Sequence, residues 1–233
     1  MDLLTAFVIT LALITLVSIR YRISPFFTLI GGSILFGLLG GLTLDATMLG
    51  IIAGIGKVFS AFGIIILCGA VTVLVLAPQP ARSLGLSQGA KHAGMIIFDI
   101  SGAGALGFVI VKSGFAQAAL GELTLFIPVI LVPFLLAALI ETAQGSRVVT
   151  AVITAEVLAG SAVVSAIHPV PLILLICAGS CIVSYVTDPF FWLVQRTTGD
   201  DVRTVVRNYT LPVALVGIFL LIVAICLEYV VFR

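Results

Sequence analysis

Long runs of apolar residues, separated by short polar segments, extend along almost the whole chain. The apolar runs cover approximately residues 1–19, 25–42, 58–77, 93–111, 123–140, 148–167, 172–194 and 209–230. About 20 apolar residues are enough for a helix to cross the hydrocarbon core of a bilayer. The pattern therefore predicts an all-α integral membrane protein with about eight hydrophobic segments.

The composition agrees with a lipid environment. Hydrophobic residues make up 61% of the 233 positions and charged residues only 9%, and the mean hydropathy is +1.35. Soluble domains carry about 25% charged residues, so this chain lacks the side chains for a water-facing surface. The formal net charge of +1 provides no basic surface for nucleic acid. We expect a multi-pass protein of the cell membrane whose partner is the lipid bilayer, with no nucleic acid.

One shift in composition divides the chain. The polar segment 78–92 separates an N-terminal three-span segment, residues 1–77, from a C-terminal five-span segment, residues 93–233. Basic residues cluster in this segment and in two others, and the positive-inside rule is satisfied if all of them face the cytoplasm. These residues are Arg20, Arg22, Arg82, Lys91, Arg196, Arg203 and Arg207. Residues 78–92 are therefore predicted to be a cytoplasmic connector.

The segment "GAGALG", from Gly102 to Gly107, matches the pattern of a dinucleotide-binding loop. That loop requires a preceding strand and a following helix, and here the pattern lies inside an apolar run. Glycines this dense favour close helix packing or a broken helix with exposed backbone groups. Gly102 and Gly104 are therefore candidate substrate-binding positions, and no nucleotide is expected.

The four cysteines all lie inside apolar runs, where cysteine behaves as a small hydrophobic residue. No histidine or further cysteine completes a set of metal ligands around them. We predict core packing for these residues, with no metal and no cofactor. They are Cys68, Cys177, Cys181 and Cys226.

Four carboxylates, Asp99, Glu141, Glu156 and Asp188, lie in or beside apolar runs. A carboxylate at the centre of a membrane costs about 2.5–3.5 kcal/mol on insertion scales, so it normally faces a cavity or a partner. The alternative is a helix end near the lipid headgroups, which for Asp188 is open because Arg196 follows two turns later. Glu141, Glu156 and Asp188 are the candidate proton-coupling residues.

Two places predict broken or re-entrant helices, near residues 141–147 and near residues 184–190. In "ETAQGSR", Gly145 and Ser146 can end one helix and cap the next. In "SYVTDPF", Asp188 suits the N-cap of a new helix and Pro189 suits its first position. Broken helices persist in membranes where they are buried in protein or line a watery cavity, and their N-terminal ends favour anionic groups. Together the two breaks indicate a solute site.

Several segments carry a family resemblance. "TAQGSRVVTAVITA", "AGSCIVSYVTDPFFWLV" and "GMIIFDISGAGALGFVIVKSG" resemble segments of the gluconate permease (GntP) family of proton-coupled sugar-acid symporters. The opening of the chain, residues 21–63, is also similar to that family. The resemblance is to a shortened form that lacks the family's middle region. Thr187 stands where the family has Asn, and Glu141 replaces a usual Arg.

The resemblance implies a permease without enzymatic chemistry, which takes up a small organic or sugar acid such as gluconate together with a proton. In the family's manner, hydrogen bonds to the substrate would come from Gln144, Gly145, Ser146, Ser184 and Thr187. Asp188 would restart a helix at the edge of the cavity and carry or position the proton. The alternative is a transport-inactive shortened paralogue that acts as a membrane scaffold or accessory subunit.

The missing middle region also predicts an assembly. Transporters of this kind usually place the substrate between two related halves, so a single copy would lack one wall of its cavity. The glycine-rich second span and the Gly50-xxx-Gly54 pair provide surfaces for close helix approach. We therefore expect a homodimer.

Overall fold

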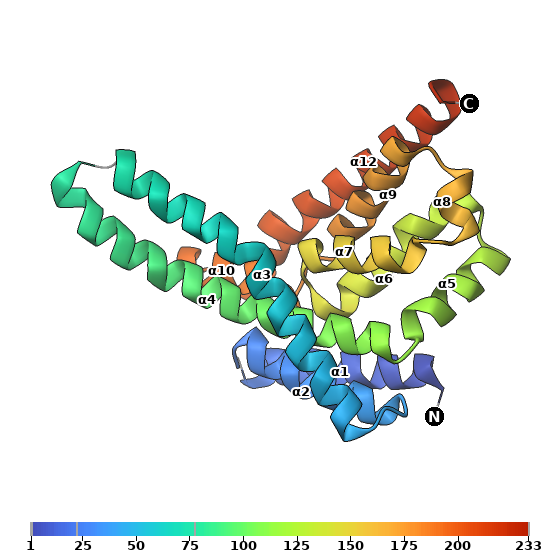
Figure 1. The fold of residues 1–233 in the computed structure, drawn as a ribbon, viewed down its shortest axis with the longest axis horizontal. Helices are drawn as coiled ribbons and strands as arrows, with labels where there is room; N and C mark the ends of the chain where they lie inside the picture. Colours follow the sequence, from blue (N-terminus) through green and yellow to red (C-terminus); the bar gives the residue numbers. More distant parts are fainter. Residues whose placement is uncertain (1, 22, 77, 233) are drawn as a thin grey trace.

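The structure is a computed structural model that describes residues 2–21, 23–76 and 78–232. Every regular element in these three ranges is helical, which confirms the all-α prediction (Figure 1). The elements are α1 (Leu3–Tyr21), α2 (Pro25–Leu39), α3 (Leu44–Leu76), α4 (Gln79–Lys112), α5 (Phe115–Phe126), the 3₁₀ turn η1 (Val129–Leu131), α6 (Val132–Gln144), α7 (Arg147–Leu158), α8 (Ala162–Ala166), α9 (Pro169–Ile182), α10 (Pro189–Thr198), α11 (Val202–Val205), the π-helical turn η2 (Val206–Thr210) and α12 (Leu211–Val230).

Length and composition make four helical stretches of the described chain able to cross a membrane. They are Leu3–Tyr21, Leu44–Leu76, Gly85–Lys112 and Val202–Val230. Shorter apolar helices span Pro25–Leu39, Val129–Gln144 and Pro169–Ile182. The chain is therefore a multi-pass membrane protein in which helices long enough to cross a membrane are combined with shorter apolar helices.

Two predicted boundaries differ from the structure. Residues 44–76 form one continuous helix, although the sequence suggested that a separate span begins near residue 58. Residues 79–92, expected as a connector, are the first part of α4. Each helix continues because no proline interrupts its interior, whereas Pro78 lies between α3 and α4 where the chain reverses. The division into segments 1–77, 78–92 and 93–233 remains a prediction.

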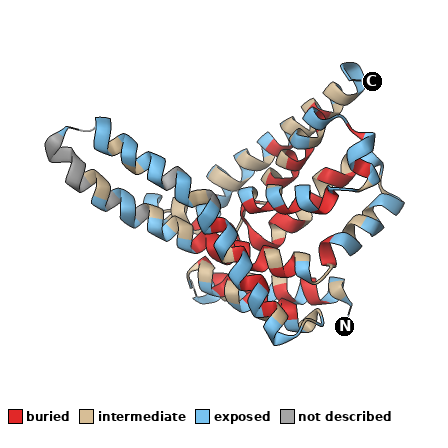
Figure 2. Cartoon of the chain, in the orientation of Figure 1, coloured by how far each residue is buried: buried red, intermediate tan, exposed pale blue. Residues whose placement is uncertain are grey.

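Helices α3 and α4 form a long hairpin that projects away from the other helices (Figure 1). The outer part of this hairpin is largely exposed, whereas buried residues concentrate where its base meets the other helices (Figure 2). At that base Gly54 lies against Gly104: a methyl group added to Gly104 would lie 2.7 Å from the Gly54 carbonyl oxygen. The absence of side chains lets the two backbones meet directly.

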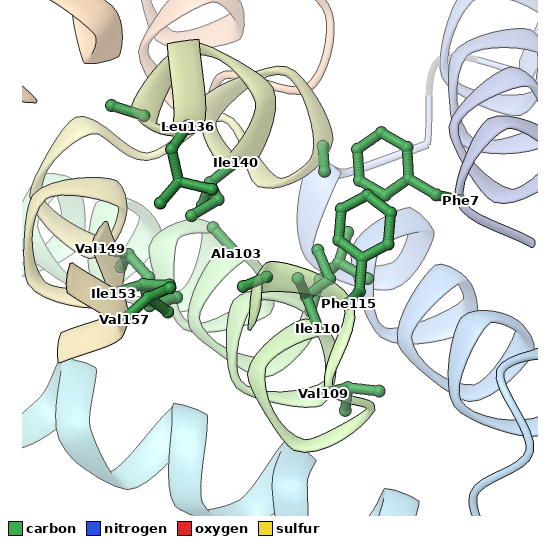
Figure 3. Packing of buried hydrophobic residues seen from close by; sticks show 14 of the residues in the cluster. Phe7, Ala103, Val109, Ile110, Phe115, Leu136, Ile140, Val149, Ile153 and Val157 are labelled. Atoms are coloured by element: carbon green, nitrogen blue, oxygen red, sulfur yellow. The ribbon is translucent and has the colours of Figure 1, made fainter. Parts of the chain in front are cut away.

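The core is formed around the second half of α4, which contacts α2, α3, α6 and α7. Ala103, Val109 and Ile110 of this stretch lie among buried side chains from the neighbouring helices (Figure 3). The rings of Phe7 and Phe115 stack with their centroids 4.5 Å apart. This packing holds the start of α7 and the end of α6 in place, where the candidate site lies.

The glycine motifs serve helix contacts within the chain. Helix α4 is continuous through Gly102 and Gly104, so of the two expected alternatives the structure shows packing and not a broken helix. Gly102 lies against the backbone of Phe26 in α2. Gly50 faces Val109 and Gly54 faces Gly104, so this pair is occupied inside the chain. The homodimer remains a prediction that these two glycines do not support.

We predict that Gly54→Ala lowers the thermal stability of the detergent-solubilised protein. The added methyl group would lie 2.8 Å from the Cα of Ala105, and overpacking of this kind costs about 1–3 kcal/mol. Gly56→Ala is the matched control, because Gly56 is exposed on the same helix with nothing within 4 Å of an added methyl group. The control should be neutral or stabilising by up to about 1 kcal/mol. Equal melting temperatures for the two variants would contradict the close α3–α4 contact.

Candidate functional site

The first predicted break separates α6 from α7. Helix α6 ends at Gln144 and α7 begins at Arg147. Gly145 between them has a φ of +70°, and its N–H donates to the Glu141 carbonyl oxygen at 2.8 Å. This left-handed conformation costs little only for glycine. The break predicted near residues 141–147 is confirmed.

The second predicted break separates α9 from α10. Helix α9 ends at Ile182 and α10 begins at Pro189. Asp188 is the N-cap: its Oδ1 accepts a hydrogen bond from the Phe190 N–H at 2.8 Å. Proline is tolerated at the first helical position because its missing N–H has no intrahelical partner there. The break predicted near residues 184–190 is also confirmed.

The two breaks touch each other. A methyl group added to Gly145 would lie 2.5 Å from the Asp188 amide nitrogen, closer than side-chain carbons approach. The Thr187 hydroxyl donates to the Thr142 carbonyl oxygen at 3.3 Å, near the end of α6. Gly145 is therefore required for its conformation and also for the close approach of the second break.

Arg147 is the cation of the site. Its Nη2 donates to Ser184 Oγ at 2.7 Å and to the Tyr209 hydroxyl at 2.6 Å, and it forms an ion pair with Asp188 Oδ2 at 3.1 Å. The Tyr209 hydroxyl also donates to Asp188 Oδ2 at 2.9 Å. The Asp188 side chain is 1% exposed and that of Arg147 is 28% exposed. The negative charge of Asp188 is thus balanced by Arg147 and stabilised by hydrogen bonds, while the Arg147 side chain remains partly exposed.

The position of Arg147 within its helix needs this compensation. Arg147 is the first residue of α7, and a cation at a helix N-terminus opposes the helix dipole. The ion pair with Asp188 offsets this unfavourable interaction between Arg147 and the helix dipole. Its Nε is buried and has no hydrogen-bond partner among the described residues, so Arg147 retains a free donor.

A second polar group lies beside the first break. Glu141 and Gln144 are both 0% exposed. The Thr150 hydroxyl donates to Glu141 Oε2 at 2.6 Å and accepts a hydrogen bond from Gln144 Nε2, which also donates to the Ser146 carbonyl oxygen at 2.9 Å. This polar group is fully enclosed, in contrast to Arg147.

Backbone groups left free by the second break are bonded by side chains. The Thr210 hydroxyl donates to the Ser184 carbonyl oxygen at 2.5 Å, and Trp192 Nε1 donates to the Val186 carbonyl oxygen at 2.8 Å. Tyr209 and Thr210 belong to the π-helical turn η2, a form often found at functional sites. The turn brings both side chains to the break.

Most of the predicted site residues are brought together, and three are not. Glu141, Gln144, Gly145, Ser146, Ser184, Thr187 and Asp188 all lie at the two breaks. Gly102 and Gly104 lie instead at helix contacts of α4. Glu156 lies further along α7, where its 45% exposed side chain pairs with Lys57. The substrate and proton roles of all these residues remain predictions.

Asp188 lies at a helix end, as the headgroup alternative requires, but its cation is not Arg196. Asp188 is buried and pairs with Arg147. Arg196 instead pairs with Asp99 at 3.7 Å, and Ser24 donates to Asp99 at 2.6 Å. Asp99 is therefore held at a separate location, against α10.

Sequence reasoning missed Arg147, Tyr209 and Thr150. The available signal was Arg147 itself, a lone cation that follows the glycine break and opens an apolar helix. A cation in a membrane run requires an anionic partner, just as the carboxylates required a cationic one. Tyr209 and Thr150 carried no comparable signal, because such residues are ordinary in an apolar helix.

Comparisons with known proteins agree on a family. Residues 81–230 match the family model described as GntP family permease. The chain is 30% identical over 168 residues to an uncharacterized permease of Haemophilus influenzae, covering 70% of this chain and 34% of that protein. It is 34% identical over 125 residues to the Gnt-II system L-idonate transporter of Escherichia coli, covering 53% of this chain and 28% of that protein. The chain thus spans about a third of the length of these relatives. No solved structure matches it.

We predict that Gly145→Ala destabilises the protein more than Gly160→Ala. Both glycines have positive φ, +70° and +80°, so both variants incur the left-handed penalty of about 1–2 kcal/mol. Only Gly145 faces a neighbouring backbone, whereas nothing lies within 4 Å of a methyl group at Gly160. The clash should add about 1–3 kcal/mol, measured by thermal unfolding in detergent. A larger loss for Gly160→Ala would refute the contact between the breaks.

Proposed function

The chain belongs to the GntP permease family, and on that premise we propose that it carries out proton-coupled uptake of a small organic or sugar acid across the cell membrane. Membership indicates a transporter and not an enzyme. The name of the Escherichia coli relative, an L-idonate transporter, favours a hydroxylated monocarboxylate. Gluconate, the substrate named in the family resemblance, has the same chemistry.

The observation that carries the proposal is the Arg147 guanidinium at the meeting point of the two breaks. Guanidinium groups bind carboxylates in a planar, two-point arrangement that an ammonium cannot reproduce. Arg147 uses Nη2 for its internal contacts and retains a free Nε. In the proposed complex the substrate carboxylate binds this side chain and competes with Asp188 for its charge.

The surrounding groups suit the rest of a sugar acid. Ser184 and Tyr209 place hydroxyl groups on Arg147, Thr187 lies at the second break with its hydroxyl on the end of α6, and Gln144 and Ser146 belong to the first break. Hydroxyl groups both donate and accept hydrogen bonds, so they can bond a substrate hydroxyl whether it acts as donor or as acceptor. The N-terminal ends of α7 and α10 both lie here, and their dipoles favour an anion.

Proton coupling requires a carboxylate that changes its charge during transport. The proposed carriers are Asp188, Glu141 and Glu156. Asp188 is closest to the proposed substrate position, because it shares Arg147 with it. Asp188 and Glu141 both lie at the two breaks, so a proton on either one lowers the negative charge near Arg147 and favours entry of the substrate anion together with the proton.

The test is uptake of labelled L-idonate and D-gluconate by the full chain in proteoliposomes under an inward proton gradient. Arg147→Lys keeps the charge but loses the two-point geometry, so apparent substrate affinity should weaken about 10–100-fold. This corresponds to the loss of about 1.5–3 kcal/mol for a charge-assisted hydrogen bond. Arg203→Lys, at an exposed arginine near the start of the last span, is the matched control and should behave as wild type.

Wild-type affinity in Arg147→Lys would overturn the role of Arg147. A folded wild-type chain that takes up neither acid would favour the other hypothesis, a transport-inactive scaffold or accessory subunit. Circular dichroism and size-exclusion profiles in detergent establish that each variant is folded before uptake is compared.

A further inference from the structure

Two buried oxygen atoms beside the first break lack hydrogen-bond donors. Glu141 and Gln144 are completely buried, and Glu141 Oε1 and Gln144 Oε1 have no hydrogen-bond partner within the part of the chain that the structure describes. A buried polar atom without a partner costs about 1–3 kcal/mol. Two such atoms on residues one helical turn apart need a common explanation.

In this arrangement the hydrogens of the group are directed to other acceptors than these two oxygens. Gln144 Nε2 donates to the Ser146 carbonyl oxygen and to the Thr150 hydroxyl oxygen. Turning the Gln144 amide over would place its oxygen against the Ser146 carbonyl oxygen and lose that hydrogen bond, so the arrangement with Nε2 toward Ser146 is favoured. The Thr150 hydroxyl proton is directed to Glu141 Oε2. The group is one donor short.

Glu141 also lacks a cation. The ion pairs among the described residues are Lys57–Glu156, Arg147–Asp188 and Arg196–Asp99, and Glu141 is in none of them. The charged or titratable groups that act on Glu141 are Arg147 on α7, Asp188 at the start of α10 and Cys181 on α9. Asp188 already balances Arg147, so one cation faces two carboxyl groups. Burying a second ionised carboxylate without a partner costs several kcal/mol.

We propose that Glu141 is the residue that binds the coupling proton, at Oε1, with Gln144 Oε1 as the acceptor of the resulting hydrogen bond; this rests on the proposed transport function. One added proton supplies a donor at Glu141 Oε1 and removes the uncompensated charge, and its hydrogen bond to Gln144 Oε1 would satisfy the second oxygen. Thr150 and Gln144 are positioning residues, because they hold the carboxyl group through hydrogen bonds. The proton arrives from water on one side and leaves to water on the other, and no other bond changes.

The location of Glu141 explains how its proton is coupled to an anion. Glu141 is on α6, immediately before the break, and Arg147 is on α7, immediately after it. An ionised Glu141 would repel a substrate carboxylate at Arg147, whereas neutral Glu141 would not.

The experiment compares Glu141→Gln with the matched control Glu122→Gln in the full chain, reconstituted in sodium-free proteoliposomes. Glu122 is exposed on α5 and lies outside the site. Two activities are measured: accumulation of labelled L-idonate driven by a proton gradient, and exchange of the same solute at equal pH on both sides across a pH series. We expect Glu141→Gln to lose gradient-driven accumulation while its remaining exchange becomes independent of pH. Glu122→Gln should match wild type in both.

Infrared difference spectroscopy between high and low pH provides a readout independent of transport. Wild type should show a carboxylic-acid C=O band that is absent from Glu141→Gln and present in Glu122→Gln. This result supports the proposal even if the wild-type chain moves no solute, a failure that would count against the proposed function alone. If Glu141→Gln does not fold, Glu141→Asp keeps a titratable carboxyl group and should show the band at a shifted position.

Three outcomes would overturn the proposal. The first is gradient-driven accumulation by Glu141→Gln at the wild-type level. The second is wild-type accumulation that fails in the sodium-free vesicles and appears when sodium is added, because the free oxygens would then bind sodium and not a proton. The third is a carboxylic-acid band that persists in Glu141→Gln, which would move the proton to Asp188 or Glu156.

Discussion

A helix interrupted inside a membrane exposes peptide groups that neither water nor lipid can satisfy, and the centre of this protein depends on solving that problem twice in one place. The solution is to let nearby side chains bond the backbone groups that the breaks leave free. Thr187 bonds the end of α6, Thr210 bonds the Ser184 carbonyl oxygen, and Asp188 caps α10. Gly145 allows the two breaks to approach closely enough for this to happen.

The same arrangement concentrates charge where an anion can use it. Arg147 opens α7 against the helix dipole, and Asp188 balances its charge in the ion pair at the meeting point of the two breaks. Glu141 lies on the other side of the break without a cation of its own. One cation lies near two carboxyl groups, so the proposed proton on Glu141 would set the charge of the site and link the backbone geometry to the proposed coupling.

The glycines illustrate how similar residues serve different purposes in this fold. Gly54 and Gly104 remove side chains so that α3 and α4 can touch within continuous helices. Gly145 adopts a left-handed conformation and also faces the Thr187–Asp188 backbone, where a side chain would clash. The first pair stabilises the scaffold, while the last defines the site. A glycine-rich segment therefore says little about function until its neighbours are known.

The sequence by itself determined the membrane class and the two breaks, because both depend on local properties. Apolar run length predicts spanning helices, and the Gly145-Ser146 and Asp188-Pro189 pairs predict helix ends through their own backbone preferences. It could not determine that the breaks meet, or that Asp188 pairs with Arg147, 41 residues away, and with Tyr209, 21 residues away. It also could not separate Glu156, exposed beside Lys57, from Glu141, enclosed beside Thr150. Only the tertiary structure decided these points, because the charge and hydrogen bonds available to a carboxylate depend on which helices pack around it.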